Sequence, residues 1–266
     1  MKRIFITGGA SGLGRALAER YAREKWSVCI GDVHETRGGE TLTALKSLTP
    51  RAHFLKCDVT SDADLENALN WLVTNWGGID VVVNNAGVAT SGPMHELPLK
   101  DWAWIVDINL MGVVRGCKIF SPLLIKQGRG TIINIASIAG LVYVAGGASY
   151  NATKAAVIAL SETMRLELAP KEIQVSVVCP YFFRTNLTET LRSTSAAQAR
   201  MTEKFVKDSR MDAATIADRV YRAANRGDFM IFPDFMSRVL SRLKRFMPAP
   251  LFFWILSFQL KRLRIT

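Results

Sequence analysis

Two side chains with complementary acid and base chemistry stand four residues apart in the middle of the chain. Tyr150 and Lys154 fall in a segment with helical periodicity, so they share one face of the predicted helix. A phenol, with an ordinary pKa of about 10, is a poor base at neutral pH, but a neighbouring ammonium favours the phenolate. Tyr150 can then accept the proton of an alcohol. Ser137, just beyond the preceding predicted strand, can hold the alcohol oxygen.

The same Tyr-x-x-x-Lys spacing occurs at Tyr21 and Lys25, so spacing alone does not identify a site. That second pair closes the first predicted helix, ahead of the second strand. Ligands of α/β sheets bind at the other end, outside the carboxyl ends of the strands. Position in the fold therefore favours Tyr150 and Lys154.

A glycine-rich loop joins the first predicted strand to the first predicted helix, with glycines at positions 8, 12 and 14. Glycine lets the backbone turn sharply and approach a pyrophosphate closely, and the N-terminus of the following helix offers free N–H groups. The alternative is a simple tight turn. The strand before the loop and the helix after it favour dinucleotide binding.

The second predicted strand ends at Asp32, close to the spacing at which an acidic side chain accepts the ribose hydroxyls of NAD. Its charge would repel the additional phosphate of NADP, so NAD is the predicted cofactor and NADP is less favoured. The alternative is that Asp32 is a strand-end turn residue. Arg15 and Arg37 are interpreted as surface charges rather than phosphate ligands.

The elements that must position these residues alternate along the chain. Short, nearly continuous apolar runs, typical of strands buried on both faces of a parallel sheet, occur at 4–6, 28–30, 53–55, 81–83, 132–135, 175–178 and 229–232. Apolar residues at three- and four-residue spacing predict helices at 12–25, 61–76, 101–127, 150–169 and 212–226. Ser61 followed by Asp64 favours a helix start.

Strands that alternate with helices build parallel sheets through right-handed crossovers. The predicted fold class is α/β, with a Rossmann-type doubly wound parallel sheet of about seven strands and helices on both faces. This catalytic domain spans residues 1–234, and residues 235–266 form a C-terminal helical appendage. Residues 181–211, rich in small polar and charged side chains, are interpreted as a mobile excursion over the carboxyl end of the sheet.

Further motifs complete an ordered pattern. They are Asp58 after the third strand, Asn84-Asn85-Ala86-Gly87 after the fourth, Asn109, and the segment from Pro180 to Thr185. Together with the glycine loop, Ser137 and the Tyr150 helix, they make the sequence resemble the short-chain dehydrogenase/reductase family over roughly residues 2–233. Each motif is weak alone, but all of them in order are specific.

The resemblance implies a catalytic tetrad of Asn109, Ser137, Tyr150 and Lys154, in which Asn109 anchors a water that relays the proton outward. It also implies contacts between NAD and Gly8, Ser11, Gly12, Leu13, Gly14, Asp32, Asp58, Val59, Asn85, Ala86, Gly87, Tyr150, Lys154, Pro180 and Thr185. Asp58 would hold the adenine, Thr185 the carboxamide and Lys154 the nicotinamide ribose, while Asn84 would support the central strand. Tyr181 departs from the family pattern, which usually has glycine after the proline.

Apolar side chains follow both Ser137 and Pro180. Leu141, Val142, Tyr181 and Phe182 predict a hydrophobic pocket for a lipid-, steroid- or retinoid-like alcohol or ketone. The alternative is that some of them pack in the core or at a subunit contact. The predicted reaction is hydride transfer between NAD(H) and a hydroxyl or carbonyl group of such a compound. The competing hypothesis is a catalytically silent nucleotide-binding protein at a membrane surface or in a complex.

Composition narrows the class of protein. With 266 residues and 49% apolar side chains, the chain is long and apolar enough for a buried core without disulfide or metal staples. The four cysteines, far apart in apolar stretches, are predicted to be buried free thiols, and the three histidines show no metal-ligand spacing. The first apolar run is too short for a signal peptide. These features predict a cytoplasmic protein.

The net charge of +11 is uneven, because seven of the excess positive charges lie in residues 235–266, which contain no acidic residue. An amphipathic segment there is followed by the apolar run Leu251 to Leu260, which as a helix rises only about 15 Å, half of a bilayer core. Two interpretations stay open. The tail lies on an anionic membrane surface, so that the protein is peripherally membrane-associated, or it packs on the body or a partner subunit.

No nucleic-acid partner is predicted, because the basic residues of the tail accompany a continuous apolar block and no recognition motif. Small residues on the Tyr150 helix, at Ala155, Ala156 and Ala159, permit close helix packing. Together with the family resemblance they predict a homodimer or homotetramer.

Overall fold

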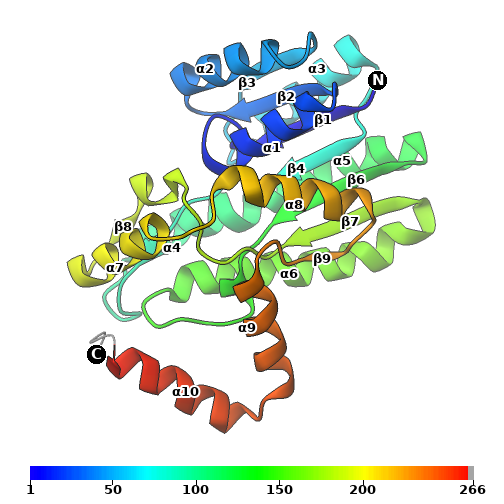
Figure 1. Cartoon of the computed structure of the whole chain (residues 1–266). Helices are drawn as coiled ribbons and strands as arrows, with labels where there is room; N and C mark the ends of the chain where they lie inside the picture. Colours follow the sequence, from blue (N-terminus) through cyan, green and yellow to red (C-terminus); the bar gives the residue numbers. More distant parts are fainter. Residues whose placement is uncertain (263–266) are drawn as a thin grey trace.

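A parallel sheet of seven strands forms the centre of the protein in the computed structural model, which describes residues 1–262, and side chains up to residue 258 (Figure 1). In spatial order the strands are β3 (Ala52–Lys56), β2 (Ser27–Asp32), β1 (Arg3–Thr7), β4 (Val81–Asn84), β6 (Gly130–Ile135), β7 (Ile173–Val178) and β9 (Met230–Ile231). The order reverses direction between β1 and β4, which is the switch point at which ligands of doubly wound sheets bind. The predicted fold class is confirmed.

Helices cover both faces of the sheet because successive strand residues point to opposite sides. Ile4 and Ile6 pack against α1 (Gly12–Arg23), α2 (Glu35–Lys46) and α8 (Ala213–Asn225). Phe5, between them, lies in the second core cluster with side chains of α3 (Asp62–Trp76), α5 (Gly112–Gln127) and α6 (Ala148–Leu168). The four cysteines are buried and unpaired in the described part of the chain.

Two helices of the body, α2 and α7 (Ala196–Lys207), are not predicted by the apolar periodicity of the sequence. Helix α2 has two glycines in its sequence, ETRGGETLTALK, which weaken the helical pattern, but Gly38 is needed because a Cβ there would lie 2.2 Å from the Phe54 ring. Helix α7 buries only Val206 and is rich in polar side chains, typical of a surface helix. It lies in the predicted excursion, together with a short 3-10 turn (Asn186–Thr190) and strand β8 (Arg192–Ser193), which pairs with β5 (Thr90–Ser91).

The predicted helix 101–127 is a composite. Helix α4 (Leu99–Val106) passes through one π-helical turn (Asp107–Met111) into α5. The run Leu99–Gln127 is long and apolar enough to cross a membrane by composition, but it packs core side chains such as Ile105, Phe120 and Leu124 against the rest of the protein. It is therefore a core helix of the α/β body.

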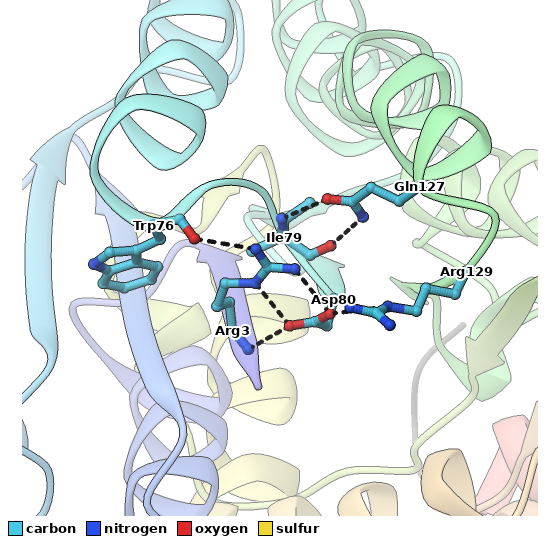
Figure 2. A network of polar contacts seen from close by, with 6 residues as sticks. All are labelled: Arg3, Trp76, Ile79, Asp80, Gln127 and Arg129. Carbon is cyan, nitrogen blue, oxygen red and sulfur yellow. Dashed lines mark hydrogen bonds and ion pairs between the residues drawn. The ribbon is translucent and has the colours of Figure 1, made fainter. Parts of the chain in front are cut away.

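A dense polar cluster closes the amino edge of the sheet, opposite the ligand edge (Figure 2). Arg3 grips Asp80 through two side-chain contacts of 2.8 and 3.0 Å, and Gln127 bonds both the N–H and the C=O of Ile79. Burial raises the pKa of Asp80, but the hydrogen bonds from Arg3 outweigh it and hold this pKa below its ordinary value. The cluster joins the start of β1 to the start of β4 and is structural.

The C-terminal appendage is a helix pair, α9 (Phe235–Phe246) and α10 (Ala249–Arg262), which Figure 1 shows below the sheet. Asp234 caps α9 by accepting the N–H of Ser237 at 2.7 Å, and its other oxygen accepts the N–H of Tyr181 at 2.9 Å. Phe252 of α10 is 7% exposed and lies in one cluster with Ile138 and Val142. One side of the tail therefore packs on the body, as one of the two interpretations required.

Candidate functional site

The carboxyl edge of the sheet gathers the predicted site residues, because parallel strands all end on the same side. The glycine loop follows β1, Asp32 ends β2, and Asp58 lies beyond β3. Asn85 follows β4, and Ser137 follows β6. Segments far apart in the sequence thus meet at one edge.

The glycine loop turns as the sequence predicts. Gly8 and Gly12 have φ angles of +64° and +52°, which L side chains rarely adopt. Gly14 is required by proximity, since a Cβ there would lie 2.1 Å from the carbonyl oxygen of Gly8. A Cβ on Gly12 would lie 2.7 Å from Thr185 Oγ1, so the predicted carboxamide ligand Thr185 does stand over the loop.

The N-terminus of α1 has the properties of an anion site. Its N-cap, Ser11, makes no side-chain capping bond, and the first turn holds no acidic residue. By contrast α3 and α8 are capped by the side chains of Ser61 and Asp212. The first N–H groups of α1 therefore lack a side-chain acceptor, and they lie beside the glycine loop. This arrangement fits the pyrophosphate of a dinucleotide.

Asp32 is hydrogen-bonded to the backbone of the glycine loop. Its carboxylate accepts the N–H of Ala10 at 2.9 Å and that of His34 at 3.0 Å. Each oxygen keeps a lone pair for a further donor such as a ribose hydroxyl. Arg37, the nearby cation in the sequence, is engaged with Glu189 at 2.7 Å, in agreement with its interpretation as a surface charge.

Asp58 and Val59 form the next wall of the predicted cofactor site. An oxygen of Asp58 accepts both the N–H and the hydroxyl of Thr60, which fixes the turn after β3. Val59 is 6% exposed and lies against Gly112, where an added Cβ would approach its side chain to 2.9 Å. Both residues thus have fixed positions at the sheet edge.

Asn84 and Asn85 are neighbours in the sequence, but one bonds inside the core and the other bonds the glycine loop. Asn85 donates to the carbonyls of Thr7 and Gly8 at 2.8 and 3.1 Å, which fastens the end of β4 to the glycine loop. Asn84 points into the protein and donates to Asn134 of β6 at 2.9 Å, and thereby supports the central strand as expected. Asn134 in turn donates to Ser161 of α6. Asn134 was not predicted, because a lone asparagine in a strand carries no motif.

The predicted proton-transfer group is assembled where β6 meets α6. The Ser137 hydroxyl lies close enough to the Tyr150 phenol to lower its pKa, and Lys154 Nζ lies 5.8 Å from the centroid of the Tyr150 ring. Lys154 is 4% exposed and donates to the carbonyl of Ile135 at 2.9 Å. Tyr21 and Lys25, the second pair with this spacing, are not brought together in this way. Tyr21 is buried between Trp26 and Tyr221, and Lys25 lies outside α1 with a φ of +62°.

Burial dominates the electrostatics of this group. It raises the pKa of Tyr150, and the Ser137 hydroxyl offsets only part of the rise. Burial also lowers the pKa of Lys154 to about 8, slightly opposed by the nearby Cys179 thiol. The predicted lowering of the phenol pKa is therefore not seen in the protein alone. Each group is shifted toward its neutral form.

A buried ammonium costs stability, which gives a first prediction. Replacing Lys154 with methionine should raise the melting temperature of the cofactor-free protein at pH 7 by about 2–4 °C, equivalent to about 1 kcal/mol. Between pH 8 and the ordinary lysine pKa of 10.5 the unfolded chain binds more protons, so wild-type stability rises with pH there. The difference in melting temperature between the variant and the wild type should therefore narrow above pH 8. Calorimetry checks it, with the exposed Lys118→Met as control, and coincident wild-type and variant curves at pH 7 would contradict it.

Asn109 occupies the π-helical turn and is fully buried. Its side chain accepts the N–H of Val88 at 2.8 Å and donates to the carbonyl of Val88 at 2.9 Å. A Cβ on Gly87 would lie 3.2 Å from Asn109 Oδ1 and 3.6 Å from Lys154 Nζ, so these side chains converge there. The side chain therefore positions the loop after β4, and the relay water stays a prediction.

The predicted substrate residues separate into two groups. Leu141, Val142 and Tyr181 belong to the cluster that α10 covers. Phe182 instead stacks on Phe205 of α7, with ring centroids 5.2 Å apart. The segment after Ser137 is joined to the segment after β7, because the carbonyl of Pro180 accepts the N–H of Ile138 at 2.9 Å. Phe252 was not foreseen as a neighbour of this region, since nothing local ties residue 252 to residue 142.

The whole arrangement matches known proteins. The family model described as short chain dehydrogenase matches residues 2–196. The chain belongs to the short-chain dehydrogenase/reductase family. A "CLA biosynthesis dehydrogenase/reductase" of Lactiplantibacillus plantarum is 33% identical over 264 residues, with 92% of each chain covered. The proteins of this family are oxidoreductases that act on alcohols or ketones.

Two solved structures show the same fold with a nicotinamide cofactor. A short-chain dehydrogenase/reductase from Burkholderia phymatum in complex with NAD has a TM-score of 0.86 and 29% identity, covering 91% of this chain and 92% of that one. A short-chain dehydrogenase from Sphingobium yanoikuyae in complex with NADPH has a TM-score of 0.77 and 26% identity, covering 88% of each. Members of this dehydrogenase family thus bind either dinucleotide.

Proposed function

We propose that this dehydrogenase transfers hydride between NAD(H) and a hydroxyl or carbonyl group of a hydrophobic substrate. The observation that carries the proposal is the placement of buried Lys154 5.8 Å from the Tyr150 ring centroid, with Ser137 beside the phenol, at the edge that holds the open N-terminus of α1. Proton donor, oxygen anchor and dinucleotide cradle thus share one edge of the sheet. The nicotinamide would supply the hydride chemistry and, when oxidised, a positive charge.

In this proposal Tyr150 moves the proton. In the oxidation direction its phenolate takes the proton of the substrate alcohol, and in reduction its phenol donates one to the carbonyl oxygen. Ser137 keeps the substrate oxygen within reach of the phenol. A positive charge near the site lowers the phenol pKa, against the rise that burial imposes. The Lys154 ammonium would favour the phenolate by its charge, and it would hold a ribose hydroxyl of the cofactor.

NAD is the cofactor in the proposal because of Asp32. Its carboxylate is held by the N–H groups of Ala10 and His34, so it cannot swing away to admit a phosphate without losing both bonds. The cation that could offset that phosphate, Arg37, is paired with Glu189. These contacts favour ribose hydroxyls over a 2′-phosphate.

The hydrophobic substrate class rests on the apolar cluster of Val142, Tyr181 and Phe252, which we assign as one wall of the substrate site. Replacing Phe252 with alanine removes its ring from that wall, and we expect about a tenfold rise in the KM of an apolar substrate with little change in kcat. Steady-state kinetics checks this. The matched control is Phe253→Ala on the same helix, since Phe253 is 58% exposed. Equal KM values for both variants would contradict the assigned wall.

The activity itself is tested with purified protein, NAD⁺ or NADH, and a series of secondary alcohols and ketones of increasing apolar size. Absorbance of the reduced nicotinamide reports turnover. We expect NAD-linked activity whose kcat/KM rises with the apolar area of the substrate. Nucleotide binding without turnover in either direction, with NAD or NADP, would instead support the catalytically silent alternative.

A further inference from the structure

The C-terminal helix pair leaves a large apolar surface uncovered. We call it the tail surface, and its exposed side chains are Phe235, Met236, Leu243, Phe246, Leu251, Phe253, Trp254 and Phe258. Phe246 is 79% exposed and Trp254 is 66% exposed. Scattered exposed apolar residues are ordinary, but eight large ones on two successive helices mark an interaction surface.

Helix α9 packs Leu240 and its C-cap Met247 against the body and leaves most of its other large apolar side chains exposed. Ser237, on the inner side, is fully buried through the cap with Asp234, and Lys244 reaches inward to donate to the carbonyl of Leu141. Lys244 Nζ also lies 3.7 Å from the centroid of the Tyr143 ring. These polar anchors fix the rotation of α9, so Phe235 and Phe246 must face away from the body.

Basic side chains run along the tail surface. Arg238, Arg242 and Arg245 are spaced by four and three residues, so they form one row on α9, and all three are exposed. Residues 235–266 contain no Asp or Glu. Two copies of the tail placed face to face would therefore bring like charges together, which disfavours a second copy of this chain as the partner.

We propose that the tail surface docks on an anionic lipid bilayer. Apolar and aromatic side chains beside a row of arginines suit the boundary between headgroups and acyl chains, and each basic residue near an anionic leaflet adds attraction. Helix α10 has 14 residues, about 21 Å in length, so it lies in the interface rather than spanning the bilayer. Since Phe252 packs on Val142, docking brings the predicted substrate wall to the membrane.

The test is sedimentation of the full-length protein with vesicles of phosphatidylcholine, alone or mixed in equal parts with phosphatidylglycerol. A triple variant, Phe246→Ser, Trp254→Ser and Phe258→Ser, should lower partition onto the mixed vesicles at least about tenfold. A second triple variant, Arg238→Gln, Arg242→Gln and Arg245→Gln, should lower it by about a hundredfold and remove the preference for the anionic lipid. Added salt should weaken wild-type binding.

The control variant replaces equally exposed leucines of the body, Leu99→Ser with Leu166→Ser, and should bind vesicles as the wild type does. Circular dichroism of every variant confirms folding. The proposal is overturned if the wild type does not sediment with mixed vesicles, or if the control loses as much binding as the tail variants. It is also overturned if the tail variants change only the oligomeric state measured by ultracentrifugation, which would assign the surface to a second copy.

Discussion

Replacing Tyr150 with phenylalanine is expected to lower kcat by about 10²- to 10⁴-fold, the contribution usual for a positioned general acid or base. The substitution removes one oxygen, the proton carrier, and keeps the ring. Cofactor binding should persist, because the glycine loop, Asp32 and Lys154 are untouched. Single-turnover kinetics with a substrate found in the alcohol and ketone series, together with NADH titration, separates the two effects.

The matched control for this experiment is Tyr21→Phe. Tyr21 has the same Tyr-x-x-x-Lys spacing, but it is 1% exposed and packs on Trp26 and Tyr221. We expect wild-type kcat from it. A Tyr150→Phe enzyme that retains wild-type turnover would remove Tyr150 from the proposed proton transfer.

Replacing Asp32 with asparagine should lower the preference for NAD over NADP by about a hundredfold, measured as the ratio of the two kcat/KM values. The substitution keeps an oxygen acceptor for the N–H of Ala10 or His34 and removes the charge that repels a 2′-phosphate. A hundredfold change corresponds to about 2.7 kcal/mol, within the range for losing a charge-assisted hydrogen bond together with a repulsion.

Glu35→Gln is the control for this second experiment, because Glu35 is also a carboxylate near the end of β2. Its side chain is 64% exposed and paired with Lys56 at 2.6 Å. Its removal should leave the preference unchanged. If the wild type already uses NADP better than NAD, Asp32 does not select the cofactor as proposed.

Much of the fold followed from local pattern. Buried parallel strands carry continuous apolar runs, so each of the predicted strands is present, although β9 shrinks to Met230–Ile231. The capping pair Ser61 and Asp64 correctly marked the start of α3, since a side-chain cap is a contact within one turn. Helix α2 was missed for the opposite reason. Its glycines suppress the helical signal, and the contact that requires Gly38 comes from Phe54, on the next strand.

The candidate site shows the same division. Glycine at positions 8, 12 and 14, and the Tyr150 helix after Ser137, are ordered motifs that the sequence determines by itself, because their chemistry depends on residue type and near spacing. The tertiary structure decided the burial and the hydrogen-bond partners of these site residues. Burial sets the direction in which the pKa values of Tyr150 and Lys154 shift. The backbone of Val88 hydrogen-bonds the Asn109 side chain.

The tail is the clearest case. Its sequence determined a basic, apolar helix pair without acids, but left open whether the apolar residues face the body or the outside. The tertiary structure assigned Phe252 to the body, beside Val142, and left Phe246 and Trp254 exposed. Helical periodicity fixes which residues share a face, whereas the direction of that face depends on contacts such as Lys244 to Leu141, which join distant parts of the chain.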